Sequence, residues 1–193
     1  AGRGQQLAAL PVKRAALAAG LPVLQPERLR DEEFLGALRA WRPELAVVVA
    51  YGKILPAAIL ELPRFGCINI HASLLPRYRG AAPIQWAIYN GETVTGVTIM
   101  RINERMDAGD ILLQRETAIA PDETYGALQA RLAELGAAAL REALPALLAG
   151  ELVAQPQDEA AATYAPMIRK EQGRVDWTRG AAAVANAARA FHP

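Results

Sequence analysis

The order of apolar and polar positions along the chain predicts short helices and strands that alternate. Apolar residues at helical spacing predict helices over residues 12–19 and 26–41, each followed by glycine or proline. Residues 45–51 form a continuous valine-rich run, which is typical of a strand covered on both faces in a parallel sheet. Residues 67–73 predict a second strand.

The middle of the chain continues this alternation and ends in a long helix. Residues 95–102 alternate between polar and apolar side chains, which predicts a less buried strand. Leucines at helical spacing predict a helix over residues 122–150, kinked at Pro145. Asp122 is expected to cap its start and Gly150 to end it. Further predicted elements are a helix over 81–92, a turn and strand over 106–120, and a last helix over 178–191.

Strands and helices in this order predict an α/β fold with a mostly parallel sheet. The 193 residues suffice for one good-sized core. After residue 150 the pattern loosens into an edge strand, loops and the last helix. The sequence opens without an initiator methionine and stops at Phe-His-Pro, so we expect it to be part of a longer protein.

Composition and charge argue against several classes of protein. Apolar residues make up 52% of the chain, which is enough to fold, and 21 basic against 20 acidic residues give a net charge of +1. This balance argues against binding nucleic acid through bulk charge, although a local basic loop stays open. The single cysteine excludes an internal disulfide and is typical of a reducing compartment. No apolar run approaches the roughly 20 residues of a membrane span, and no signal-peptide pattern opens the sequence.

The candidate chemistry lies at the end of the second predicted strand. Side chains alternate faces along a strand, so Cys67, Asn69 and His71 share one face. Asn69 and His71 stand about 6.6 Å apart along the strand, close enough to meet one small group. His71 ends the strand, and ligands of open α/β sheets bind at the carboxyl ends of strands. An amide donor and an imidazole suit attack on an acyl carbon, because they can stabilise an oxyanion and accept a proton.

A carboxylate should complete such a site by orienting the histidine or relaying protons. Asp107 is the best candidate, since it lies in a glycine-containing turn, and Asp110 is the rival. Each residue also has a plain structural interpretation. His71 could be a core histidine bonded to backbone, Asn69 could tie down a loop, and the two aspartates could build a surface turn.

Other kinds of site are poorly supported. Two histidines and one cysteine cannot form a common zinc site without several carboxylates, so no metal is expected. The sequence holds no phosphate-binding loop, no G-x-S-x-G and no G-x-G-x-x-G after a strand. Ser73 follows a strand, but capping or turn bonding is favoured over a role as nucleophile.

Three segments resemble the formyltransferases that use 10-formyltetrahydrofolate. They are "CINIHASLLPRYRGAAPIQWAI", "GVTIMRINERMDAGDILLQ" and "AYGKILP", which carry that family's Asn-x-His, Ser-Leu-Leu-Pro and downstream aspartate turn. Within the family the chain is most similar to members that formylate methionyl-tRNA, judged by "RGAAPIQWAI", "TYAPMIRKEQGRVDW" and the opening "AGRG…PVKRAAL". The resemblance covers nearly all of the 193 residues.

The resemblance implies roles for particular residues. Asn69, His71 and Asp107 fall on the family's catalytic positions. The implied contacts with the folate co-substrate are Ile54, Leu55, Ser73, Leu74, Leu75, Pro76 and Asp110. The implied contacts with the acceptor end of a tRNA are Arg3, Lys13 and Arg14, for which a solvated loop is an equal alternative.

The resemblance also implies a domain plan. It implies a Rossmann-like formyltransferase domain that is truncated at its first strand, since the family's first strand and helix are absent before Ala1. Residues 1–150 would form the catalytic domain. Residues 151–193 would form its end and the start of a linker to a carboxyl-terminal β-barrel that the sequence does not contain.

The implied reaction passes a formyl group from 10-formyltetrahydrofolate, without a metal, to the α-amino group of initiator methionyl-tRNA. It implies a cytoplasmic monomer in translation initiation and one-carbon metabolism. Alternatives are a sibling enzyme acting on an amino sugar nucleotide or a purine precursor, and a formyl-folate hydrolase. A module that lost its site is disfavoured by the intact Asn69, His71 and Asp107, and a nucleotide-binding domain by the missing glycine motif.

Overall fold

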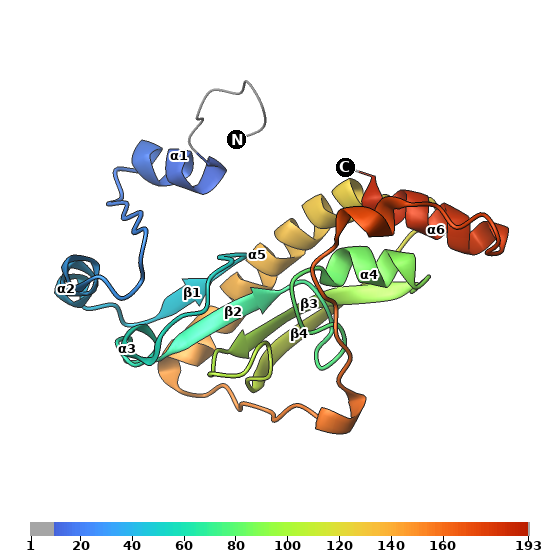
Figure 1. The fold of residues 1–193 in the computed structure, drawn as a ribbon. Coiled ribbons are helices and arrows are strands. Elements are labelled where there is room, and N and C mark those ends of the chain that lie inside the picture. The colour runs from blue at the N-terminus through green and yellow to red at the C-terminus, as the bar shows by residue number, and fades with distance from the viewer. Residues whose placement is uncertain (1–9, 193) are drawn as a thin grey trace, which may run out of the picture. The chain divides into compact units, whose positions relative to one another are not determined.

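The computed structural model describes residues 10–192, and the chain divides at Trp41 into two compact units. The first unit holds helices α1 (Pro11–Ala18) and α2 (Glu32–Trp41) (Figure 1). The helix predicted over 12–19 is confirmed, whereas α2 begins at Glu32 rather than at residue 26. Asp31 explains the later start, because its carboxylate accepts a hydrogen bond from the amide of Glu33 at 3.1 Å.

The second unit is built on a four-stranded sheet. The strands, in order across the sheet, are β1 (Ala46–Val48), β2 (Cys67–His71), β3 (Val94–Arg101) and β4 (Ile111–Ala118). β1 pairs with β2 in parallel, and the other two pairings are antiparallel. The α/β class is confirmed, but the sheet is mixed rather than mostly parallel. One cause is the connection of residues 102–110, which contains no helix and is too short to return a parallel strand.

Helices and turns complete the second unit. They are α3 (Ala57–Leu60), α4 (Pro83–Tyr89), α5 (Tyr125–Ala149), η1 (Glu159–Ala161), η2 (Lys170–Gly173) and α6 (Ala181–Phe191). The cap of α5 is Thr124 and not Asp122, because the Thr124 side chain accepts from the amide of Ala127. Gly150 ends α5 with a φ of 73°, as predicted, and the helix runs through Pro145. Within residues 10–192, no helix is both long and apolar enough to cross a membrane.

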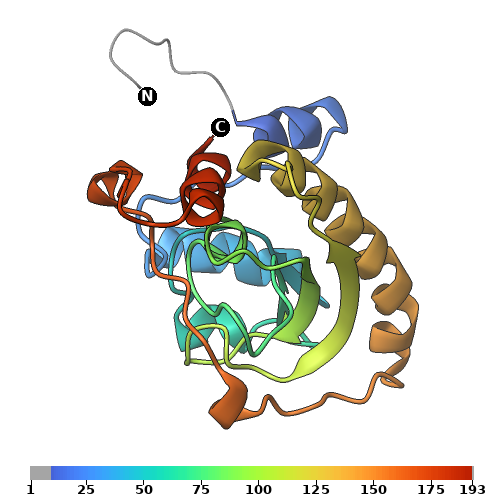
Figure 2. The same cartoon turned by 90° about the vertical axis from the view of Figure 1, so that its right-hand side faces the viewer.

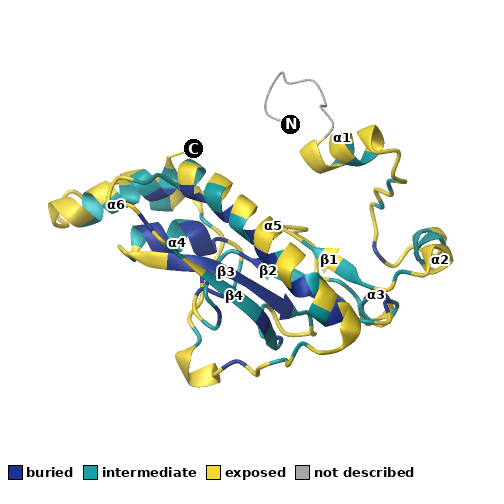
Figure 3. Cartoon of the chain, turned by 180° about the vertical axis from the view of Figure 1, so that it is seen from behind, coloured by how far each residue is buried: buried dark blue, intermediate teal, exposed yellow. Residues whose placement is uncertain are grey.

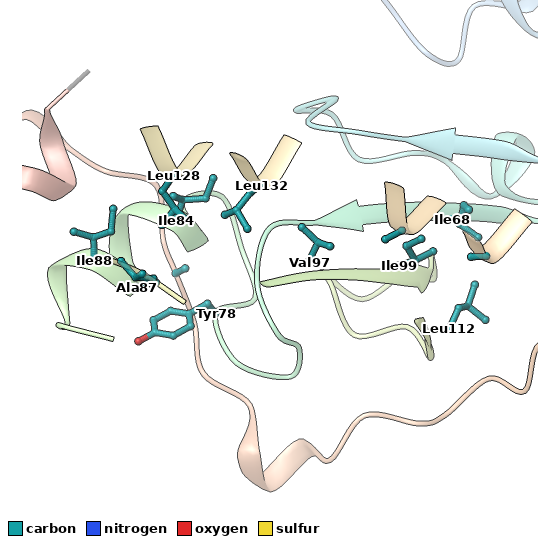
Figure 4. Close-up of a cluster of buried hydrophobic side chains, with 14 of the residues drawn as sticks. Ile68, Tyr78, Ile84, Ala87, Ile88, Val97, Ile99, Leu112, Leu128 and Leu132 are labelled. Carbon is teal, nitrogen blue, oxygen red and sulfur yellow. The ribbon is translucent and has the colours of Figure 1, made fainter. Parts of the chain in front are cut away.

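The core lies between α5 and one face of the sheet. A Cβ atom on Gly136 of α5 would lie 2.9 Å from Cγ2 of Ile70, so the helix approaches this face closely. Fully or almost fully buried side chains fill the space around it, among them Ile68, Val97, Ile99, Leu128 and Leu132 (Figure 4). Because side chains alternate along β2, Asn69 and His71 lie on the opposite face of the sheet.

The burial of β3 corrects the prediction made for residues 95–102. Its residues from Thr95 to Met100 are all buried, and Figure 3 shows the strand in dark blue. The polar position Thr98 faces a loop instead of solvent, and its hydroxyl donates to the carbonyl of Ser73 at 2.6 Å. The alternation therefore separates a face covered by α5 from a face covered by the loop after β2.

Candidate active site

His71 ends β2 with only 6% of its surface exposed. Its Nε2 lies 2.9 Å from the carbonyl oxygen of Tyr78. A carbonyl can only accept a hydrogen bond, so Nε2 carries a proton, and in the neutral ring Nδ1 keeps its lone pair. One nitrogen is thus held by the backbone, and Nδ1 is the nitrogen left for chemistry.

The Nδ1 side of His71 faces the carboxylate of Asp107. The distance from Nδ1 to Oδ2 is 3.8 Å, which allows an ion pair when the ring is protonated but is too long for a hydrogen bond. The same Oδ2 accepts from the amide of Gly80 at 2.9 Å. The Asp107 side chain keeps 18% of its surface exposed, so the pair is open to solvent on this side.

Asn69 lies on the same face of β2, two residues before His71, and is half-buried. It stands opposite Met100 of β3 and Val48 of β1 in the sheet register. None of the hydrogen bonds within residues 10–192 engages its carboxamide. An amide with unused donors beside an imidazole is suited to bind an oxygen that gains negative charge.

The turn after β3 places Asp107 and not Asp110 beside the histidine. Asp107 has a φ of 50°, in the left-handed region that aspartate tolerates better than most residues. A Cβ atom on Gly109 would lie 1.8 Å from the carbonyl oxygen of Arg101, so only glycine fits there. The carbonyl of Asp110 closes the turn by accepting from the amide of Arg101 at 2.9 Å. Its carboxylate makes no hydrogen bond within the described part of the chain.

The Ser-Leu-Leu-Pro loop is anchored inward. Ser73 is fully buried, and its hydroxyl donates to the carbonyl of Arg77 at 2.7 Å. Leu75 is buried as well, and its amide donates to the hydroxyl of Thr98 at 3.1 Å. Ser73 and Leu75 therefore point into the protein and shape the loop, and their contact with a co-substrate stays a prediction. Leu74 and Pro76 are half-buried.

The segment after β1 is apolar and open. Ile54 is 92% exposed, Tyr51 is exposed and Leu55 is half-buried. Because β1 and β2 are parallel, this segment leaves the sheet at the edge where His71 ends β2. The structure brings Ile54 and Leu55 to this edge, but no hydrogen bond within residues 10–192 joins either to the three polar residues.

The predicted tRNA contacts belong to the first unit. Arg3 lies outside the described residues. Lys13 donates a hydrogen bond to the side chain of Gln25, and Arg14 is exposed on α1. A role in binding RNA stays a prediction for all three.

The residues that hold the site in place were missed by the sequence analysis. Arg79 is 1% exposed, and its Nε donates to Oε1 of Gln157 at 2.9 Å. Its terminal nitrogens donate to Glu159 at 3.0 and 3.1 Å, and Arg105 bonds the same carboxylate. These hydrogen bonds lower the pKa of Glu159 to about 2. No sequence pattern signals a pairing across 78 residues.

Cys67 lies on the same face of β2 as Asn69 and His71, but its side chain is buried. Its thiol contacts the carbonyls of Ile59 and Leu60, and burial raises its pKa, which keeps the thiol neutral. Within residues 10–192, no three histidine, cysteine, aspartate or glutamate side chains gather in a way that could hold a metal ion.

The sequence matches known proteins over its whole length. The model of the formyl transferase family matches residues 1–144. The methionyl-tRNA formyltransferases of Acidobacterium capsulatum and of Synechococcus sp. (strain JA-3-3Ab) are 54% and 55% identical to the chain over 193 residues. These matches cover 100% of this chain and 62% and 60% of the relatives, so the chain spans about three fifths of their length.

Solved structures share the fold at lower identity. WlaRD, a sugar 3N-formyl transferase crystallised with dTDP and 5-N-formyl-THF, matches 93% of this chain and 62% of its own at a TM-score of 0.75 and 20% identity. HypX from Aquifex aeolicus, in complex with tetrahydrofolic acid, matches 81% of this chain and 27% of its own at a TM-score of 0.71 and 24% identity. The family model accounts for three quarters of the sequence, and the fold agrees with it. The chain belongs to the formyl transferase family.

Proposed function

We propose that this protein transfers a formyl group from 10-formyltetrahydrofolate to the α-amino group of methionyl-tRNA. The observation that carries the proposal is His71, fixed by the Tyr78 carbonyl on Nε2 and facing Asp107 with Nδ1. Asn69 adds an uncommitted amide donor on the same face. The choice of acceptor is supported by relatives of that name at 54% and 55% identity over the whole chain.

The proposed formyl donor is supported from two sides. Two neighbours in fold were crystallised with tetrahydrofolic acid or 5-N-formyl-THF. In this chain, the exposed apolar side chains of Tyr51 and Ile54 at the edge of the site offer a surface on which a flat ring system can pack. Leu74 and Pro76 offer part of a second wall. When bound there, the donor supplies an activated formyl carbon.

The attacking amine requires little activation. An α-amino group has a pKa of about 7.7–8.0, and the neighbouring ester lowers it, so much of it is neutral near pH 7. As its nitrogen bonds to the formyl carbon, the formyl oxygen becomes an oxyanion. Asn69 donates a hydrogen bond to that oxygen, which is worth about 3 kcal/mol for one donor of this kind.

His71 moves the proton. Nδ1 takes the proton from the attacking nitrogen, because Nε2 is already committed to Tyr78. Asp107 stabilises the resulting imidazolium from 3.8 Å. The proton then passes to N10 of the folate as the carbon–N10 bond breaks, which releases tetrahydrofolate and the formylated amine.

The test measures formyl transfer by the full-length protein. Formyl-labelled 10-formyltetrahydrofolate is supplied with charged initiator methionyl-tRNA or with a nucleotide-linked amino sugar. We expect label on the tRNA-bound methionine. Transfer to the amino sugar alone, or release of formate without an acceptor, contradicts the proposal.

The runner-up is transfer to an amino sugar nucleotide. It is favoured by the likeness to WlaRD at a TM-score of 0.75. It ranks second because sequence identity is 20% there, against 54% for the relative from Acidobacterium capsulatum.

The domain plan and the setting are part of the proposal. Residues 1–150 form the catalytic domain, and residues 151–193 form its end and the start of a linker. The protein works as a cytoplasmic monomer. The reduced, buried Cys67 is consistent with a reducing compartment.

A further inference from the structure

Residues 155–165, named the strap from this point, belong to the orange segment that runs below the sheet in Figure 2, and they are bonded at both ends. At one end Gln155 and Ile111 exchange backbone hydrogen bonds of 2.8 and 2.9 Å with each other. At the other end, the amide of Arg79 donates to Thr163 at 2.8 Å, and the amide of Ala165 donates back to Arg79 at 2.7 Å. The strap therefore ties β4 to the loop that follows β2.

One side chain reaches inward from the strap. Gln157 is 9% exposed, and its Nε2 donates to the carbonyls of Asp107 at 2.9 Å and of Gly109 at 2.7 Å. Its Oε1 accepts from Arg79 at 2.9 Å. The amide has one possible orientation, since two carbonyls need a donor and a guanidinium needs an acceptor.

The turn that contains Asp107 and Gly109 needs support from other parts of the chain. Asp107 adopts the left-handed conformation, which is strained for a residue with a side chain and persists where the surroundings hold it. Residues 103–106 before it are exposed. Besides the Gly80 amide and His71, which meet the Asp107 carboxylate, the Gln157 side chain holds the backbone carbonyl of Asp107.

We infer that Gln157 is a positioning residue that keeps the Asp107 carboxylate in reach of His71. The inference rests on the proposed function in one respect, because Asp107 matters for turnover through His71. The strap also supports the Nε2 side of the His71 imidazole, through Tyr78. Thr163 accepts from the amide of Tyr78 at 2.8 Å, and the carbonyl of Tyr78 holds His71.

The variant Gln157→Glu tests this inference in the full-length protein. It keeps the size of the side chain and an acceptor for Arg79, but it sets an oxygen against the two carbonyls of the turn. We expect kcat to fall about 10- to 100-fold, since small misplacements of reacting groups cost this much. KM for both substrates should stay within about twofold, because no binding surface changes.

The matched control is Gln155→Glu, the same substitution two residues away on an exposed side chain. We expect its kcat and KM to equal those of the unchanged protein. Equal kcat values for Gln157→Glu and the control overturn the inference. So does a loss in Gln157→Glu that lies in KM alone.

A second readout needs no activity. The Gly80 amide donates to the Asp107 carboxylate, so its hydrogen-exchange rate reports whether that carboxylate is in place. We expect exchange at Gly80 to rise at least about tenfold in Gln157→Glu and to stay unchanged in Gln155→Glu. Unchanged exchange in both variants overturns the inference. Faster exchange in a protein that formylates no acceptor leaves the positioning intact and refutes the proposed function.

A folding control separates positioning from bulk stability. If Gln157→Glu does not give a cooperative unfolding transition, Gln157→Met, which is neutral and of similar length, is measured in the same two ways. A folded Gln157→Met with slow turnover and fast exchange at Gly80 supports the inference. Failure of both variants to fold overturns it, because the residue is then needed for the fold as a whole.

Discussion

The two flanks of the site are built in opposite ways. On one flank, β3 is buried from Thr95 to Met100, and its Thr98 hydroxyl bonds the loop beside His71 (Figure 3). On the other flank, β1 is three residues long, and the side chains of Tyr51 and Ile54 beyond its end are exposed. The buried flank holds the proposed reacting groups in place, and the open flank offers apolar surface on which the proposed formyl donor can pack.

The contrast separates two kinds of effect. A change on the buried flank should act on turnover or on stability, because it moves or frees groups that have no other partners. A change on the open edge should act on binding, because nothing in the second unit depends on those side chains for burial.

Removing the amide of Asn69 should give the largest effect. We expect Asn69→Ala to lower kcat about 100- to 1000-fold, since one donor to the oxyanion is lost. The free energy of unfolding should change by less than about 1 kcal/mol, because the carboxamide makes no hydrogen bond within residues 10–192. Steady-state kinetics and urea unfolding measure the two quantities.

The histidine beside it provides the contrasting variant. We expect His71→Ala to lose turnover to a similar extent and also to lower the free energy of unfolding by about 1–3 kcal/mol, since the carbonyl of Tyr78 loses its partner. Near-normal turnover in either variant would refute the assignment of the site.

The sequence was sufficient to predict the local geometry of the candidate site. Period-two alternation placed Asn69 and His71 on one face of β2, and the glycine of the next turn pointed to Asp107. Gly150 was correctly predicted to end α5, because a left-handed terminal residue has a strong local preference for glycine.

The sequence was insufficient where distant segments decide. β3 is buried because α5 packs on one of its faces and the Ser-Leu-Leu-Pro loop on the other. The alternation of polar and apolar residues within β3 does not show that both faces are covered. The hydrogen bond between Arg79 and Gln157 joins residues 78 positions apart. The sequence around Arg79 does not distinguish this buried arginine from one on the surface. The combination of parallel and antiparallel pairing likewise depends on which strands become neighbours in the sheet. The residue pattern within a single strand does not determine it.

Thr98→Val probes the stability of the buried flank. The valine keeps the shape but frees the carbonyl of Ser73 and the amide of Leu75, so we expect a loss of about 2–4 kcal/mol in the free energy of unfolding. Thr95→Val is the matched control, since that buried threonine hydroxyl makes no hydrogen bond within the described residues. Equal losses in the two variants would show that the loop is not anchored through Thr98.

Ile54→Ser probes the open edge. We expect KM for the formyl donor to rise about 3- to 10-fold with kcat and stability unchanged, because part of an apolar contact worth roughly 1.5–3 kcal/mol when full is lost. Val153→Ser, which changes another exposed side chain, should leave KM alone. A fall in kcat for Ile54→Ser with KM unchanged would place Ile54 among the positioning groups and blur the contrast between the flanks.

Glu159→Gln should give the smallest effect, and that effect should depend on pH. The pKa of Glu159 is lowered to about 2 by its hydrogen bonds with Arg79 and Arg105, so its contribution to stability is complete above the ordinary value of 4.5 and disappears as pH falls toward 2. The glutamine does not titrate. The unchanged protein should therefore unfold at a higher urea concentration than the variant at pH 5–7, and the difference should shrink between pH 4.5 and 2.

The difference should stay modest at any pH, because the Glu159 side chain is half exposed and solvent screens the pair. Glu134→Gln, on the exposed side of α5, is the control that should show no such pH dependence. A difference that is the same from pH 7 to pH 2.5 would mean that the charge of Glu159 is irrelevant to the buried Arg79. In that case the hydrogen bond to Gln157 and other neutral hydrogen bonds would hold the arginine, and the strap would not depend on the ion pair at its surface.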